Sequence, residues 1–380
     1  MKKIVVAPDS FKVTMTSSEV CDLMAEGIRR VFPDATVTKL PTADGGEGTV
    51  DAVVGALGGS RRTIAAKDPF FHDIRASYGV VHNGRTAIVE MAAASGLGLV
   101  GDRGNPWLTT TYGTGQLLAH ALEAGCEELV VGIGGSATND GGVGMAAALG
   151  FRFLDRDGND IVPTGGGLAD LAKIDPSGRH RLLGQRPITA ACDVDNPLCG
   201  PRGASRIFGP QKGADPEMAD RLDRNLQHLA EVVSRDLAVD ILDLPGGGAA
   251  GGLGAGMVVF TGASLVSGID LVLDLIGFDG VLEGADLVIT GEGRLDAQSL
   301  GGKVPIGVAR RAAKAGVPVV AIVGEIAGDL SRVYETGIRA VFPTNRDGRP
   351  FSEARKTARE DLVTAVISAM RGLETLGEQR

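Results

Sequence analysis

A glycine-rich segment at residues 134–144 has the residue types that hold an anion. It reads Gly-Gly-Ser-Ala-Thr-Asn-Asp-Gly-Gly-Val-Gly and directly follows an apolar run at 129–133. A short β-branched run that breaks into glycines is typical of a buried strand that opens into a loop. Backbone amides and a helix N-terminus carry partial positive charge there, and phosphate is the usual anion that they bind. A structural turn without a ligand explains this segment almost equally well when it is considered alone.

Two further loops combine carboxylates with cations, each directly after a predicted strand. One follows the strand at 188–192 and contains Asp193, Asp195 and Asn196, with Ser205, Arg206, Gln211 and Lys212 soon after. The other follows the strand at 286–290 and contains Glu292, Arg294, Asp296, Gln298, Ser299 and Lys303. Phosphoryl transfer uses amides and cations around the phosphates, oxygen ligands for Mg²⁺, and a carboxylate that orients the attacking hydroxyl. A single Asp in a glycine-rich loop more often forms a turn, but three such loops favour this chemistry.

The glycine content also indicates loops shaped around a ligand. The chain has 57 glycines among 380 residues, about twice the usual fraction of about 7%. They cluster at 45–48, 134–144, 165–167, 246–256 and 291–293. These clusters follow no fixed period, which argues against a solenoid or a fibre.

Composition and missing motifs argue against several classes of protein. The formal net charge of −9 disfavours a nucleic-acid or anionic-membrane partner. The chain has neither a Gly-x4-Gly-Lys-Ser/Thr loop nor a Gly-x-Gly-x-x-Gly turn after its first strand. Its five histidines lack metal-ligand spacing, and no Gly-x-Ser-x-Gly elbow is present. Dehydrogenase, hydrolase and metalloenzyme functions are therefore all disfavoured.

The start of the chain alternates between strands and a helix. We expect strands at 3–7 and 36–40, and Thr16 and Glu19 match a capping box at the start of the helix between them. This order implies parallel strands, and the ligands of such sheets gather at the carboxyl ends of the strands. The charged residues that fall there are Asp9, Lys12, Asp44 and Glu47.

The rest of the chain predicts a second, different sheet inserted into the first. After residue 286 the alternation returns, with strands at 286–290, 318–323 and 340–342 and helices near 303–315 and 352–374. Between the two ends, a turn at 82–84 joins strands at 76–81 and 85–91, further strands lie near 129–133 and 188–194, and an amphipathic helix covers 217–237. We therefore predict an α/β fold with one domain of residues 1–70 plus 281–380, which contains a parallel sheet, and an inserted mixed-sheet α/β domain of residues 71–280.

Several long segments resemble the bacterial glycerate kinase family. They are residues 7–12, 43–49, 132–142, 192–198, 203–213 and 291–294, together with Asp296, Gln298, Ser299 and Lys303. The resemblance runs from the first strand to about residue 345, and Val13 is one departure from the expected pattern. It implies two α/β domains, one of them Rossmann-like, with the site in the cleft between them. It also implies transfer of the γ-phosphoryl group of ATP to D-glycerate, commonly at the 2-hydroxyl, with Mg²⁺.

Residue chemistry suggests which groups bind the substrate and which groups react. A guanidinium holds a carboxylate through two parallel hydrogen bonds, so Arg294 is the first candidate for the glycerate carboxylate and Arg206 the second. Asp296 is the candidate base, with Asp193 as its rival, and Lys303 would steady the transferring phosphoryl group. The remaining residues that we place at the substrate or in catalysis are Asp9, Asp44 and Lys12.

The nucleotide and its metal have separate candidate residues. We expect the glycine-rich loop to hold phosphates through Gly134, Gly135, Ser136, Asn139, Asp140 and Gly141. Asp193 and Glu292 are the candidate Mg²⁺ ligands, because hard cations take carboxylate oxygens and water.

The cellular setting and two alternatives complete the prediction. Four widely spaced cysteines fit reduced thiols in a cytoplasmic protein, and the N-terminus does not resemble a signal peptide. We expect no membrane or nucleic-acid partner, and a monomer or a homodimer. A kinase of another small hydroxy acid and a non-catalytic metabolite-binding protein on the same scaffold remain the alternatives.

Overall fold

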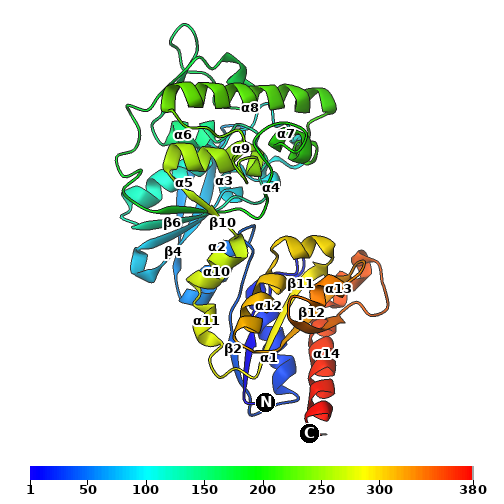
Figure 1. The fold of residues 1–380 in the computed structure, drawn as a ribbon. Helices are drawn as coiled ribbons and strands as arrows, with labels where there is room; N and C mark the ends of the chain where they lie inside the picture. The colour runs from blue at the N-terminus through cyan, green and yellow to red at the C-terminus, as the bar shows by residue number, and fades with distance from the viewer. Residues whose placement is uncertain (379–380) are drawn as a thin grey trace. The chain divides into compact units, whose positions relative to one another are not determined.

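The chain forms two compact units, which a computed structural model describes over residues 1–378. The terminal unit consists of Met1–Asp44, Asp51–Gly58 and the chain from Gly268 onward. The inserted unit consists of Gly45–Val50 and Gly59–Ser267. In Figure 1 the terminal unit takes its colours from both ends of the bar, blue and yellow to red, which shows that it is built from both ends of the chain.

A five-stranded parallel sheet forms the centre of the terminal unit. Its strands lie in the order β13-β12-β11-β1-β2, and every neighbouring pair is parallel. The bounds are β1 Lys3–Val6, β2 Thr36–Lys39, β11 Leu287–Leu295, β12 Val319–Ile326 and β13 Ile338–Pro343. Three consecutive residues of β1, Ile4, Val5 and Val6, are fully buried, as expected for a central strand with both faces covered. The predicted parallel sheet from both chain ends is confirmed.

Helices make up much of the rest of the terminal unit. They are α1 Ser17–Arg29, α2 Thr49–Leu57, α10 Gly268–Leu275, α11 Phe278–Val281, α12 Val304–Lys314, α13 Ser331–Tyr334 and α14 Phe351–Glu378. The predicted capping box is present, because Thr16 and Glu19 exchange hydrogen bonds at the start of α1. Helices α1 and α14 pack closely, since a Cβ on Gly27 would lie 2.8 Å from Val366. Helix α12 approaches α10 in the same way, through Gly307 and Ile269.

The inserted unit has a mixed six-stranded sheet. The strands lie in the order β10-β9-β6-β5-β4-β3, with bounds β3 Ser60–Lys67, β4 Asp73–Val81, β5 Thr86–Glu90, β6 Glu128–Gly132, β9 Ile188–Ala191 and β10 Ser264–Val266. The pairs β3–β4 and β4–β5 are antiparallel and the others are parallel. The predicted turn at 82–84 joins β4 to β5, with His82, Asn83 and Gly84 at positive φ. A smaller antiparallel pair consists of β7 Arg152–Leu154 and β8 Lys173–Asp175.

Strand β3 is an element that the sequence pattern did not reveal. It reads Ser-Arg-Arg-Thr-Ile-Ala-Ala-Lys and is largely exposed at the edge of the sheet, so its apolar alternation is weak. It pairs with β4 over eight residues, which places 60–67 in the inserted unit, whereas we expected residues up to 70 in the other domain. Conversely, α10 and α11 lie before residue 281 and belong to the terminal unit.

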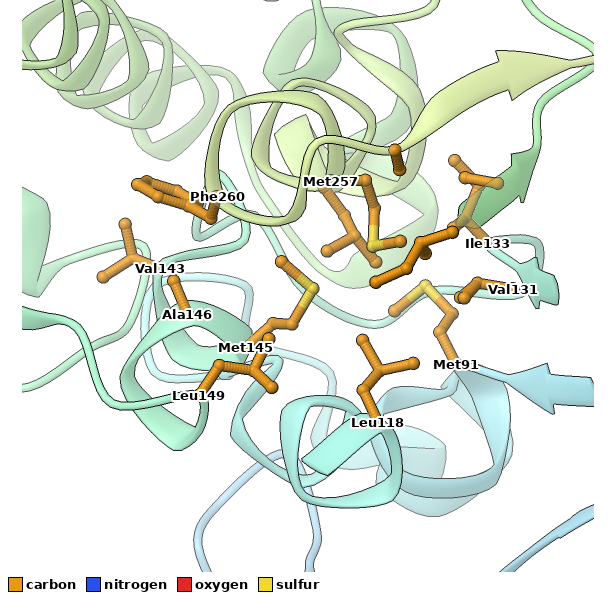
Figure 2. Packing of buried hydrophobic residues seen from close by; sticks show 14 of the residues in the cluster. Met91, Leu118, Val131, Ile133, Val143, Met145, Ala146, Leu149, Met257 and Phe260 are labelled. Carbon is orange, nitrogen blue, oxygen red and sulfur yellow. The ribbon is translucent and has the colours of Figure 1, made fainter. Parts of the chain in front are cut away.

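Helices and a methionine-rich core complete the inserted unit. The helices are α3 Ala92–Ser95, α4 Leu97–Val100, α5 Tyr112–Glu123, α6 Val143–Ala148, α7 Ala204–Phe208, α8 Pro216–Leu237 and α9 Ala249–Gly256. Figure 2 shows Met91, Met145 and Met257 packed together beside Val131 and Ile133 at the end of β6. The glycine-rich segment that follows Ile133 therefore begins directly beside the packed core. Among the helices of residues 1–378, none combines the length and apolar character that a membrane crossing requires.

Candidate active site

The terminal unit collects charged residues at the carboxyl end of its sheet. Asp9 follows β1, and its backbone N–H donates to Gly291 O of β11 at 2.8 Å. This bond continues the strand pairing beyond β1, so that the loop after β1 stays beside β11. Asp9 is only 7% exposed, whereas Lys12 lies on the surface. Asp9 is thus fixed next to β11, the strand that carries Glu292.

Two carboxyl groups at this edge have pKa values near neutrality. Burial raises the pKa of Asp9 to about 7, and the carboxylates of Asp44 and Glu292 contribute to this shift. The Ser10 N–H and the Lys12 ammonium act in the opposite direction. Burial also raises the pKa of Glu292 to about 7, although Lys303 and Ser299 favour its ionised form. Groups that titrate in this range can exchange a proton or accept a cation at physiological pH, which is typical of functional sites.

Lys303 reaches Glu292 from the start of the next helix. Its Nζ lies 3.5 Å from Glu292 Oε2, and Lys303 is the N-cap residue of α12. Its backbone N–H donates to Ser299 O at 3.2 Å, which anchors the residue to the preceding turn. The ammonium and the positive end of the α12 dipole lie at one place, so an anion is stabilised there.

Arg294 lies near the end of β11 and Asp296 directly follows this strand, so the loop that we expected after residue 290 begins only after Leu295. Arg294 Nε is 3.6 Å from Asp296 Oδ2, and the side chains are 61% and 22% exposed. The backbone N–H of Asp296 donates to Ser299 Oγ at 3.2 Å, and the Ser299 N–H donates back to Asp296 O at 3.0 Å. The structure therefore brings together the predicted substrate-binding arginine, the predicted base and the Glu292–Lys303 pair in one unit.

Arg206 and Asp193 belong to the inserted unit. Arg206 Nη1 is 2.9 Å from Asp220 Oδ1, and its Nε is 3.7 Å from Asp223 Oδ2, so its guanidinium is engaged with α8. Asp193 follows β9 and is exposed. An arginine already held by two carboxylates is a weaker candidate for a substrate carboxylate than the exposed Arg294.

The residues present fit a metal only as part of a larger ligand set. Within residues 1–378, no three His, Cys, Asp or Glu side chains are arranged to hold a metal ion by themselves. Glu292 Oε1, however, is buried and has no hydrogen-bond partner. Mg²⁺ usually takes one or two carboxylates plus phosphate oxygens and water, so one buried carboxylate oxygen suits this mode of binding.

The glycine-rich loop of the inserted unit exposes only its first part. Gly134 is half-buried and Gly135 is exposed, with φ of +71° at Gly135. Ser136 is 6% exposed, while Asn139, Asp140 and Gly141 are buried. The six predicted nucleotide-binding residues therefore divide into an outer group, 134–136, and an inner group that supports it.

Asp140 is the main support of this loop. It is fully buried, and its carboxylate accepts hydrogen bonds from the N–H and Oγ1 of Thr111 at 2.7 and 2.8 Å and from the N–H groups of Gly142 and Gly144 at 3.1 and 3.2 Å. Burial raises the pKa of Asp140, whereas these hydrogen bonds favour the carboxylate. The Thr111 Oγ1 in turn accepts the Met145 N–H at 2.8 Å. The carboxylate thus ties the end of the loop to the starts of α5 and α6.

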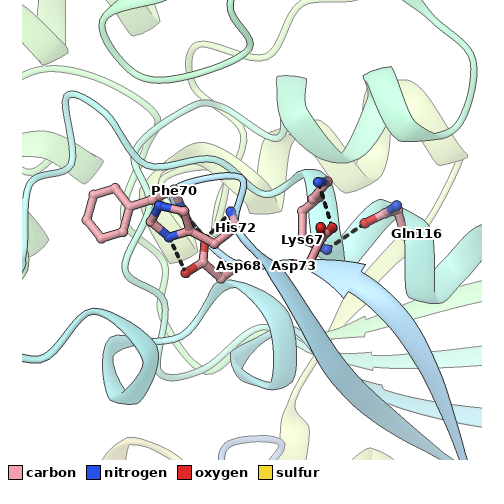
Figure 3. Close-up of polar contacts among 6 residues, drawn as sticks. All are labelled: Lys67, Asp68, Phe70, His72, Asp73 and Gln116. Carbon is pink, nitrogen blue, oxygen red and sulfur yellow. Dashed lines mark hydrogen bonds and ion pairs between the residues drawn. The ribbon is translucent and has the colours of Figure 1, made fainter.

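A turn at 67–73 extends this support. Buried Asp68 accepts the backbone N–H of His72 at 2.9 Å, and its other oxygen lies 3.1 Å from His72 Nδ1 (Figure 3). The backbone N–H of Lys67, at the start of the turn, donates to Gln116 Oε1 of α5 at 2.8 Å. The Thr110 N–H donates to the carbonyl oxygen of Pro69 in the turn at 3.0 Å. The turn, the start of α5 and the glycine-rich loop therefore form one connected polar structure.

The third support is a close backbone approach that only glycine permits. The Gly141 N–H donates to Gly251 O at 3.0 Å, and a Cβ on Gly251 would lie 2.0 Å from Thr138 O.

We expect Gly251→Ala to destabilise the protein in urea unfolding, because the methyl group must displace the loop. Gly262→Ala is the matched control, since its φ of +73° is nearly the same as the +71° of Gly251 and no atom lies within 4 Å of its Cβ position. The control should cost about 1–2 kcal/mol for the left-handed backbone, and Gly251→Ala about 1–3 kcal/mol more. Equal losses would contradict the steric account.

Two supporting residues were not identified as site residues from the sequence. No feature of the sequence placed Thr111 at the site, and the sequence indicated Lys212 only as one of several cations in loops. The structure shows that Lys212 is 1% exposed and that its Nζ donates to Thr138 O at 2.6 Å. A lysine in a Pro-Gln-Lys-Gly turn gives no sequence signal of burial, so only the fold reveals this contact.

Known proteins are similar to this chain over nearly its whole length. The model of the glycerate kinase family matches residues 4–374. A glycerate kinase of Bacillus subtilis (strain 168) is 49% identical over 359 residues, which cover 94% of each chain. A glycerate 2-kinase of Escherichia coli (strain K12) is 48% identical over 364 residues, which cover 96% of each chain.

A solved structure extends the similarity to the fold. The crystal structure of a protein described as glycerate kinase 2, from Salmonella typhimurium LT2, is 47% identical, has a TM-score of 0.89 and covers 100% of both chains. The family match, the sequence identity and the fold agree over nearly the whole length. The chain therefore belongs to the glycerate kinase family, which phosphorylates a small hydroxy acid with ATP.

Proposed function

We propose that this glycerate kinase phosphorylates the 2-hydroxyl of D-glycerate at the carboxyl end of the sheet in the terminal unit. The observation that carries the proposal is the Lys303–Glu292 pair at 3.5 Å, beside the N-terminus of α12, with Arg294 on the same strand as Glu292 and Asp296 directly after that strand. The name of the Escherichia coli relative, glycerate 2-kinase, supports the choice of hydroxyl. Incubation with ATP and D-glycerate, followed by phosphorus NMR of the product, tests it.

In this proposal Asp296 accepts the proton of the attacking hydroxyl. Its side chain is partly exposed and therefore accessible to a substrate, unlike that of Glu292. Lys303 and the positive end of the α12 dipole stabilise the charge that develops on the transferring phosphoryl group. Asp9, Asp44 and Lys12 shape the electrostatic environment of the substrate hydroxyls. Asp193 is the rival base.

Arg294 is proposed to hold the carboxylate of glycerate. The planar guanidinium binds a carboxylate through two parallel hydrogen bonds, and lysine cannot reproduce this geometry. We expect Arg294→Lys to raise the KM for glycerate by about tenfold, equivalent to about 1.4 kcal/mol of lost binding. The KM for ATP should change much less.

Arg310→Lys is the control for this experiment, because Arg310 lies on the surface of α12 in the same unit. It should leave both constants unchanged. An unchanged glycerate KM in Arg294→Lys would remove Arg294 from this role and favour Arg206.

Glu292 and Asp193 are proposed as Mg²⁺ ligands, and the bound metal would help to neutralise the phosphate charge. The pKa of Glu292 is raised to about 7, so a cation must compete with a proton for this carboxylate below that pH. We expect the Mg²⁺ concentration that gives half-maximal activity to fall as pH rises from 6 to 8, because the ionised fraction increases. Glu292→Gln should raise the Mg²⁺ requirement and flatten this pH dependence. A pH dependence unchanged in Glu292→Gln would contradict the assignment.

The outer part of the glycine-rich loop is proposed to meet the ATP phosphates. Gly134 and Gly135 reach its accessible surface and the buried Ser136 adjoins them, whereas Asn139, Asp140 and Gly141 hold it from beneath. A structure with ATP and Mg²⁺ in which the phosphates lie far from these residues would defeat the proposal.

We propose that the enzyme works in the cytoplasm, where ATP is available. The four cysteines, Cys21, Cys126, Cys192 and Cys199, are all free, which is consistent with a reducing compartment. A monomer or a homodimer is the expected assembly, and light scattering at working concentration tests it.

A further inference from the structure

We propose that Lys212 is a positioning residue for nucleotide binding, because its buried ammonium orients the backbone of the glycine-rich loop. This inference rests on the proposed role of the loop in holding the ATP phosphates. Lys212 does not itself contact the nucleotide in this account. It acts through the carbonyl group of Thr138, two residues after the outer group 134–136.

The contact is short and fully enclosed. Lys212 ends a 3₁₀ turn at Pro210–Lys212, and its Nζ donates to Thr138 O at 2.6 Å. The next residue, Gly213, has φ of +96°, and its backbone lies so close to Gly104 that a Cβ would approach Gly104 O to 2.2 Å. The backbone at Lys212 and Gly213 is therefore packed tightly against Gly104.

Burial of the Lys212 ammonium costs free energy, and an uncharged side chain could fill the same space without this cost. Desolvation lowers the pKa of Lys212 to about 7, and the carboxylate of Asp140 partly offsets the shift. Thr138, Asn139 and Ser205, which are buried polar residues of the neighbouring loop and helix, carry no charge. An apolar side chain of similar volume would often be no less stabilising than a buried ion. A function of the loop explains why a lysine stands here.

Unpaired polar atoms beside the contact support this explanation. Thr138 Oγ1 and Asn139 Oδ1 are buried without hydrogen-bond partners, while Asn139 Nδ2 donates to Ser205 Oγ at 2.9 Å. Buried polar groups without partners are rare in proteins and call for an explanation. Here they indicate that the inner side of the loop is built for a defined backbone orientation rather than for maximal stability.

The orientation matters because carbonyl and amide groups of a loop point in opposite senses. If the Thr138 carbonyl is held inward by Lys212, the preceding backbone cannot rotate to turn carbonyl oxygens toward an anion. Asp140, Thr111 and Gly251 fix the other end of the loop. Lys212 is the only cation within the described residues that donates a hydrogen bond to the backbone of 134–142.

The test compares two substitutions. Lys212→Met keeps the length of the side chain and removes the donor, and Lys212→Gln keeps a neutral donor for the Thr138 carbonyl. We expect Lys212→Met to raise the KM for ATP about tenfold with little change in the KM for glycerate and in the urea midpoint. Lys212→Gln should recover much of the ATP KM. Lys173→Met, at an exposed position in β8, is the matched control and should leave both constants unchanged.

Two results would overturn the inference. One is a folded Lys212→Met with a normal ATP KM; the other is an equal rise in both KM values together with a lowered urea midpoint, which would indicate a purely structural role. If Lys212→Met does not fold, Lys212→Gln takes its place: a small rise confined to the ATP KM supports the inference, and an unchanged ATP KM or a rise confined to the glycerate KM would contradict it.

Hydrogen exchange of the unmodified enzyme separates this inference from the function on which it rests. ATP should protect the amides of 134–138 from exchange. Absence of protection in the unmodified enzyme means that the proposed loop function has failed. Protection there, combined with normal ATP binding by Lys212→Met, means that only the role of Lys212 has failed.

Discussion

Asp296→Asn should lower kcat by about 10²–10⁴-fold, the usual contribution of a general base. Asparagine has nearly the same shape as aspartate but cannot accept the proton of the substrate hydroxyl. The turn that holds this residue uses its backbone N–H and carbonyl, bonded to Ser299, and neither bond changes on substitution. The fold and the KM for ATP should therefore be preserved. Steady-state kinetics with ADP release as the signal, together with a urea unfolding curve, gives the comparison.

Two aspartates of the inserted unit complete this experiment. Asp193→Asn tests the rival base, and Asp195→Asn is the control, because Asp195 is exposed and paired with Arg202 at 2.9 Å. If Asp296 is the base, Asp193→Asn should lower kcat less than Asp296→Asn and should raise the Mg²⁺ requirement. A near-normal kcat in Asp296→Asn together with a lost kcat in Asp193→Asn would exchange the two roles.

Lys303→Met should lower kcat by about 10²–10³-fold, the loss measured when one donor to a developing negative charge is removed. The lysine is placed at the N-terminus of α12 and 3.5 Å from Glu292. Its removal takes one positive charge from the proposed phosphoryl position and removes the cation that is paired with the buried carboxylate of Glu292. The pKa of Glu292 should then rise further, because Lys303 favours the ionised form. The activity that remains should consequently require a higher pH.

Lys314→Met serves as the control for this substitution. Lys314 is exposed in the last turn of the same helix. It should leave kcat and the pH profile unchanged. A pH profile of Lys303→Met that matches the unmodified enzyme would show that the pair with Glu292 has no part in the reaction.

Much of the fold could be predicted because its signals are local. The capping box of Thr16 and Glu19 and the turn at 82–84 each depend on a few adjacent residues, and both occur where the sequence places them. The parallel sheet of the terminal unit follows from strand-helix alternation at both ends of the chain. Strand β3 escaped because it is a polar edge strand without a clear alternation.

The candidate site was less predictable because its properties arise from distant segments. Sequence reasoning found the charged residues at the strand ends, but the pKa of Asp9 depends on Asp44 and Glu292, which lie far away along the chain. It also treated residues 134–141 as one binding surface, whereas packing divides them into exposed and buried groups. Lys212 lies 74 residues from Thr138, so no local pattern announces their contact.

The most direct test of the account is the identity of the product that the enzyme makes from ATP and D-glycerate. A coupled assay should show ADP release that depends on D-glycerate, and phosphorus NMR should show a phosphate ester on the secondary hydroxyl, that is, 2-phosphoglycerate. Asp296→Asn should abolish most of this signal under the same conditions. A product phosphorylated on the primary hydroxyl would contradict the proposed regiochemistry, and ADP release that depends on another hydroxy acid but not on D-glycerate would contradict the central claim.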